Sequence, residues 1–145
     1  MKNIRFLTIL LTFALLGNFA LAHQSKEVGD GQYRVIVGLL INPAYTGQLN
    51  GIDLIVRDAD GEPVENLEQS LSAIVIAADG SELTLQLRPQ ADNPGAYTGD
   101  FIPMLGGDLH FRVSGFIGAV EFDELFDHVT HSEHDVIDAA TIQVP

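Results

Sequence analysis

The chain of 145 residues contains no cysteine and no tryptophan, and it has only 2 methionines. Without cysteine it can form no disulfide, no blue-copper site and no thiolate site for copper(I), and no lipid can be attached through a cysteine. Beyond the first residue only Met104 offers a thioether, which is too little for a copper(I) site. The core must therefore hold the fold without covalent cross-links.

Basic residues are also scarce. The chain has 7 lysines and arginines against 20 acidic residues, and its net charge is −13. Such a charge repels nucleic acid and anionic lipid head groups, and it favours cations, basic partners or simple solubility. We therefore expect no nucleic-acid partner.

A long hydrophobic run occurs only at the start, from Phe6 to Leu16, after the basic Lys2 and Arg5. Ala20 and Ala22 then occupy the −3 and −1 positions of a cleavage site, so residues 1–22 are predicted to be a cleavable secretory signal peptide. A retained signal anchor is the alternative. Cleavage would give a periplasmic or extracellular protein that begins at His23, carries 5 basic and 20 acidic residues, and does not insert into a membrane.

The rest of the chain predicts short strands separated by turns. Leu83, Leu85 and Leu87 alternate with polar residues, and turn-forming pairs such as Asp79-Gly80 and Asn50-Gly51 recur at intervals of about ten residues. About seven such strands predict an all-β fold, an antiparallel immunoglobulin-like β-sandwich over residues 23–126, with a small closed barrel as the alternative. Residues 127–145 are predicted to form an acidic, histidine-containing C-terminal tail.

The segments Pro94–Pro103 and Gly106–Gly115 carry a P-G-x-Y-x-x-x-F-x-P hairpin followed by a G-D-x-x-F strand. This arrangement resembles the late strands of small secreted immunoglobulin-like domains of the YtkA-like group, and CopC-like copper-resistance proteins have a similar sandwich. The resemblance covers most of the chain that follows the predicted signal peptide. It implies an immunoglobulin-like domain outside the cytoplasm, among related protein groups that often handle copper.

The first candidate metal ligand is His23. After cleavage, its free amine and its imidazole would together form one chelate for copper(II), because both are nitrogen donors. The resemblance to CopC-like proteins, which bind copper(II) through an N-terminal histidine and a late Asp-x-His, implies Asp108 and His110 as weaker candidates. A terminal histidine without a metal role is the alternative.

The second candidate group is a set of three histidines at spacings of three residues, His128, His131 and His134. Imidazoles flanked by carboxylates are ligands that zinc(II), copper(II) or nickel(II) accepts. On a helical turn neighbouring members would share a face. A solvated acidic tail is the alternative.

These features predict a non-enzymatic, extracytoplasmic protein that binds copper(II) or zinc(II) and buffers or delivers it, with the metal ion and an envelope protein as partners. The alternative is an immunoglobulin-like interaction or structural module of the cell envelope with no metal. No serine lies in a G-x-S-x-G setting, so no hydrolytic triad is expected. An oxidative copper enzyme is disfavoured because few aromatic residues are available for a substrate-binding face.

Overall fold

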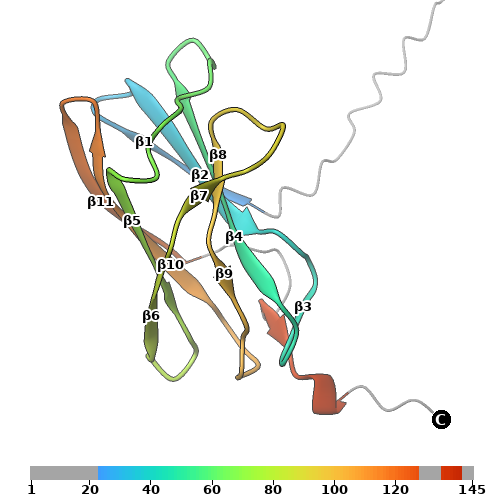
Figure 1. Cartoon of the computed structure of the whole chain (residues 1–145). Coiled ribbons are helices and arrows are strands. Elements are labelled where there is room, and N and C mark those ends of the chain that lie inside the picture. The colour runs from blue at the N-terminus through green and yellow to red at the C-terminus, as the bar shows by residue number, and fades with distance from the viewer. Residues whose placement is uncertain (1–22, 128–134, 142–145) are drawn as a thin grey trace, which may run out of the picture.

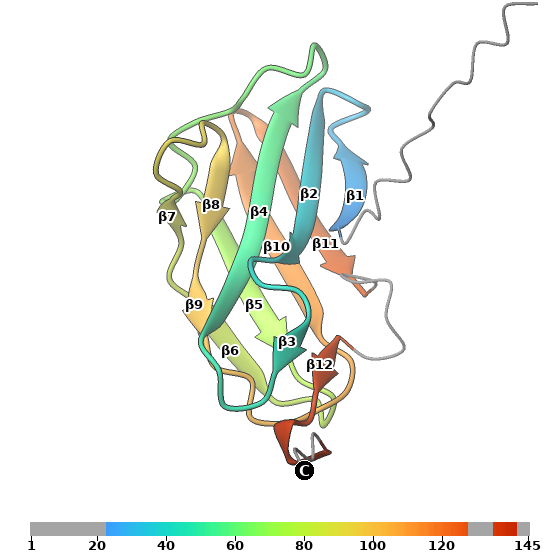
Figure 2. The same ribbon diagram turned by 90° about the vertical axis from the view of Figure 1, so that its right-hand side faces the viewer.

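The computed structural model describes residues 23–127 and 135–141 as two main β-sheets packed face to face (Figure 1, Figure 2). Within these residues there is no α-helix, and no helix is long and apolar enough to cross a membrane. Seven of the described strands have four or more residues, as expected. The elements are β1 (His23–Val28), β2 (Tyr33–Leu39), β3 (Ala44–Tyr45), β4 (Asn50–Asp58), β5 (Leu71–Ile76), β6 (Glu82–Leu85), β7 (Arg88–Pro89), β8 (Ala96–Thr98), β9 (Asp100–Phe101), β10 (His110–Ile117), β11 (Val120–Phe126), β12 (Val136–Ile137) and the 3-10 helix η1 (Ala139–Thr141).

The first sheet has the strand order β1-β2-β4-β8-β7, and β9 pairs with the beginning of β4. The second sheet has the order β11-β10-β5-β6. All neighbours in these two sheets are antiparallel. Two separate sheets make this a sandwich, as predicted, and not the small closed barrel.

The core lies between the sheets and follows the two-residue period of the sequence. In β10 and the residue before it, Leu109, Phe111 and Val113 are buried, whereas Arg112 between them is exposed. Alternation arises because successive side chains of a strand point to opposite faces. Burying one such side chain stabilises the fold by about 1.5–3 kcal/mol. The largest fully buried side chains are Tyr97, Phe111 and Phe126.

The predicted Asp79-Gly80 hairpin joins β5 to β6. The N–H of Gly80 donates to the carbonyl of Ala77 at 2.8 Å, and the N–H of Ala77 donates to the carbonyl of Ser81 at 2.9 Å. Gly80 has φ +84°, a conformation that glycine adopts without steric cost. The hairpin therefore forms where its turn residues predict it.

After β6 the chain crosses from one sheet to the other. Leu85 still pairs with Ala73 of the second sheet, whereas Arg88 pairs with Thr98 of the first. Gly99 permits this crossing, because a Cβ at that position would lie 2.8 Å from the Cβ of Leu85. The crossing segment connects the two sheets on this side of the sandwich, but only after Leu85. β6 therefore remains the edge strand of its sheet.

Part of the predicted C-terminal tail packs on the sandwich. β12 pairs in parallel with β3, and Val136 is buried at 1% exposure. The buried carboxylate of Asp135 accepts a hydrogen bond from the N–H of Leu109 at 2.8 Å. β12 therefore lies against the sandwich, beside the segment that leads into β10 (Figure 2).

Candidate functional site

His23 lies at the start of β1, on the outer face of the first sheet. It pairs with Gly38 of β2, and Gly38 pairs in turn with Asp53 of β4. Because Gly38 has no side chain, nothing from β2 stands between the other two. Nε2 of His23 lies 2.8 Å from Oδ2 of Asp53. The sheet thus joins a predicted metal ligand to a carboxylate 30 residues away.

The second carboxylate oxygen of Asp53 is also held. Nε2 of Gln90 donates to Oδ1 of Asp53 at 2.7 Å and to the carbonyl of Tyr97 at 3.2 Å. Since a carboxylate oxygen accepts, Nε2 of His23 is the donor, and in the neutral form of the ring this leaves the lone pair on Nδ1. Sequence reasoning missed Asp53 and Gln90. The glycine at the outward-facing position 38 was the available signal.

The structure does not bring the other predicted ligands to His23. Asp108 is exposed in the loop before β10, and His110 begins β10 in the opposite sheet. His110 is half-buried rather than fully solvated, and its Nδ1 is buried without a hydrogen-bond partner in the described part of the chain. His128, His131 and His134 lie outside the described residues. Across residues 23–127 and 135–141, no three histidines, aspartates or glutamates are grouped so as to hold a metal ion.

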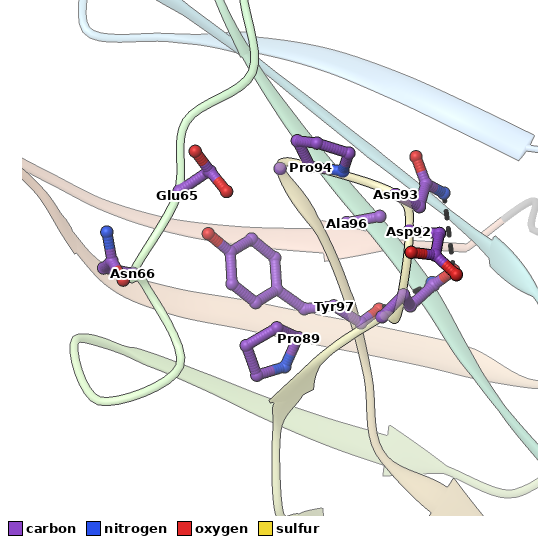
Figure 3. A pocket seen from close by; sticks show the side chains of 10 residues that line it. Glu65, Asn66, Pro89, Asp92, Asn93, Pro94, Ala96 and Tyr97 are labelled. Atoms are coloured by element: carbon purple, nitrogen blue, oxygen red, sulfur yellow. Dashed lines mark hydrogen bonds between the residues drawn. The ribbon is translucent and has the colours of Figure 1, made fainter.

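A small pocket of about 160 Å³ lies beside Tyr97 and includes Gln90 in its lining. Figure 3 shows the Tyr97 ring among the lining side chains, with its hydroxyl directed toward the segment that carries Glu65 and Asn66. That hydroxyl donates to the carbonyl of Val64 at 2.6 Å and accepts from the N–H of Leu67 at 3.2 Å. Its hydrogen bonds thus fasten the connection between β4 and β5 to the core.

A larger cavity of about 330 Å³ opens between β6 and the segment that follows β9. Its floor includes the buried residues Val75, Phe101 and Leu109. Its rim carries large apolar side chains that are exposed to solvent: Leu83 at 53%, Ile102 at 50%, Met104 at 75% and Leu105 at 44%.

The exposure of Leu83 contributes to the apolar character of this cavity. It pairs with the buried Val75 and belongs to the core-facing set of Leu83, Leu85 and Leu87, yet it is half-exposed while the other two are buried. The first sheet does not cover it, since the chain crosses between sheets only after Leu85. Sequence reasoning missed this site because Leu83 follows the core pattern. The apolar Ile102–Leu105 segment after a strand was the available signal.

The charged groups at the cavity rim are acidic. Asp79 and Glu82 contribute to the lining, and no lysine or arginine does. The Ser81 hydroxyl and then the Ser81 N–H donate to Asp79 at 2.6 and 2.9 Å, and these hydrogen bonds lower the pKa of Asp79 below its ordinary value. Asp79 therefore stays ionised to lower pH than an unbonded aspartate.

Comparisons with known proteins support the fold. No family model and no curated protein matches the chain. A DUF4426 family protein from Pseudomonas aeruginosa is 15% identical with a TM-score of 0.53, over 72% of this chain and 90% of that one. The Lin-41 filamin domain is 16% identical with a TM-score of 0.44, over 70% of this chain and 96% of its own.

The chain is an antiparallel immunoglobulin-like β-sandwich. The predicted immunoglobulin-like fold is thus confirmed. Neither neighbour gives specific support to the YtkA-like or CopC-like groups.

Proposed function

We propose that this chain is a non-enzymatic immunoglobulin-like interaction module of the cell envelope, which docks a partner protein at the cavity beside β6. The predicted signal peptide supports the location outside the cytoplasm. We prefer this function to metal binding because the described residues form a concave surface of about 330 Å³ with an apolar rim, whereas no group of three potential metal ligands is found among them.

The observation that carries the proposal is the apolar rim. Four large hydrophobic side chains surround a cavity whose floor is the core itself. Contiguous exposed apolar surface at a concave site is typical of protein interfaces, since its burial is favourable.

Site-specific photo-cross-linking tests the docking surface. A photoreactive residue at Met104 is expected to trap one protein in the source cell envelope. The matched control is Leu125, an apolar residue of β11 that is 46% exposed at the opposite edge of the second sheet. Absence of an adduct at Met104, or the same adduct from Leu125, would contradict the proposal.

A binding measurement with the purified cross-linked protein extends this test. We expect Leu83→Asp to weaken its binding by about 30-fold, because a charge would enter the apolar rim. Leu125→Asp should leave binding unchanged. Both side chains are already half-exposed, so both variants should keep the melting temperature of the parent protein. Equal affinities of the two variants would argue against the cavity.

A second candidate function, binding of copper(II) or zinc(II), is favoured by the hydrogen bond between His23 and Asp53. A histidine that binds a metal through one ring nitrogen commonly donates from the other to a carboxylate. Here Nε2 faces Asp53 and Nδ1 keeps its lone pair, and Nδ1 is the nitrogen that can close a chelate with the amine of the same residue. His23 and a cleaved terminus thus fit the amine–imidazole chelate predicted for copper(II).

Asp53→Ala is expected to weaken copper(II) binding by the protein that begins at His23 by about tenfold, because the ring loses the group that orients it. Competition titration against a copper chelator measures the affinity. An added residue before His23 should weaken binding as well, since it removes the terminal amine. The variant with alanine at His128, His131 and His134 separates this site from the tail. An Asp53→Ala affinity equal to that of the parent would contradict the orienting role.

A further inference from the structure

We infer that β6 accepts an added β-strand from the partner, namely an extended segment in which apolar and basic side chains alternate. This inference rests on the proposed docking function and specifies its geometry. Three features at β6 fit an extended segment of this kind: the open edge of the sheet, the apolar cavity beside it and the acidic residues around it.

The backbone of β6 carries hydrogen-bonding groups on the side that faces away from β5. The hydrogen bond from Ala77 N–H to Ser81 carbonyl marks a hydrogen-bonded pair, and such pairs alternate along an antiparallel ladder. The pairs Val75–Leu83 and Ala73–Leu85 continue that set. The N–H and carbonyl groups of Glu82 and Thr84 therefore point away from β5, toward the open edge of the sheet.

The other sheet edges in the described part of the chain are less suited to an added strand. The edges formed by β1 and β11 are joined to each other, because Lys26 bonds Glu124 at 3.1 Å and Gln24 bonds Asp127 at 3.2 Å. β7 has only two residues, and Pro89 has no N–H to donate. Among these edges β6 is the one that borders the apolar cavity.

The side chains around β6 determine what the added strand must carry. Leu83 faces the cavity, so inward-pointing residues of an added strand would contact the apolar rim formed with Ile102 and Met104. Glu82 borders the cavity but directly precedes Leu83 in β6, so its side chain is directed to the other face of the strand, and Asp79 lies in the adjoining turn. In an added strand, side chains alternate between the faces. An added strand therefore matches this site when its inward-pointing residues are apolar and its outward-pointing residues are basic. The net charge of −13 on the chain favours the same basic partner.

The test uses two blocked synthetic peptides, one alternating lysine with valine and one with glutamate in place of lysine. Binding is followed through the amide signals of the protein. We expect the lysine peptide to bind, with slowed hydrogen exchange at the amides of Glu82 and Thr84, and the glutamate peptide to bind at least about tenfold more weakly. Absence of lysine-peptide binding, equal binding of both peptides, or unchanged exchange at these amides would overturn the inference.

Thr84→Pro is the decisive variant, because it removes an N–H that points to the open edge and is not used in the ladder with β5. Thr84→Val, which keeps the N–H, is the matched control. We expect Thr84→Pro to bind the lysine peptide about tenfold more weakly than Thr84→Val. Equal binding would overturn strand addition. If Thr84→Pro binds as well as Thr84→Val while Leu83→Asp still weakens docking of the cross-linked partner, the proposed function stands and this inference fails.

Discussion

Replacing Gly115 with alanine should lower the free energy of unfolding by about 3–5 kcal/mol. Gly115 lies in β10 between Leu71 of β5 and Phe122 of β11, and its φ is +132°. A Cβ at this position would lie 2.1 Å from the carbonyl oxygen of Ser70. That oxygen also accepts a hydrogen bond from the N–H of Phe116 at 3.1 Å, so the backbone cannot retreat without losing it.

Chemical denaturation measures this effect, and Gly47→Ala provides the control. Gly47 also has a positive φ, +77°, but a Cβ there would meet nothing within 4 Å. Its replacement should cost only the strain of the left-handed conformation, about 1–2 kcal/mol. If both variants lose the same free energy, the close contact with Ser70 is not what requires glycine at position 115.

Tyr97→Phe should lower the free energy of unfolding by about 2–3 kcal/mol. The tyrosine is 1% exposed, and its hydroxyl bonds the backbone at both Val64 and Leu67. Phenylalanine keeps the ring but leaves the part-buried carbonyl of Val64 and the buried N–H of Leu67 without this partner. Tyr45→Phe, in β3, controls for the loss of a phenol in general. A Tyr97→Phe loss no larger than that of the control would mean that the hydroxyl does not fasten this connection.

Tyr97 also makes the free energy of unfolding depend on pH in the alkaline range. Burial raises the pKa of Tyr97 above its ordinary value, and the N–H of Leu67 opposes this only in part. Because the folded-state pKa exceeds the unfolded-state pKa, the stabilisation is complete below about pH 10 and is lost as the pH rises through the folded-state value. Between about pH 8 and about pH 11, the parent protein should lose more stability than Tyr97→Phe. Parallel pH profiles of the two proteins would contradict this.

Local rules were sufficient for much of the fold. The Asp79-Gly80 turn, the alternation through Leu109 and Phe111, and the absence of α-helix from the described residues all follow from turn chemistry and the two-residue period. These features depend on residues close together in the chain, so the sequence alone predicts them. The sequence alone also identifies His23 as a candidate metal ligand, because this prediction depends only on its position directly after the predicted cleavage site.

The sequence by itself therefore determined an acidic β-sandwich without disulfides and with an expected signal peptide. Tertiary structure decided which side chains meet. Only strand order places Gly38 between His23 and Asp53. Only the crossing after Leu85 leaves Leu83 half-exposed although it belongs to the core face. The pairing of β12 with β3 likewise joins segments that are far apart in the sequence, so only the tertiary structure shows it. The physical reason is that periodicity shows which face a residue occupies, whereas coverage of that face depends on strands distant in sequence.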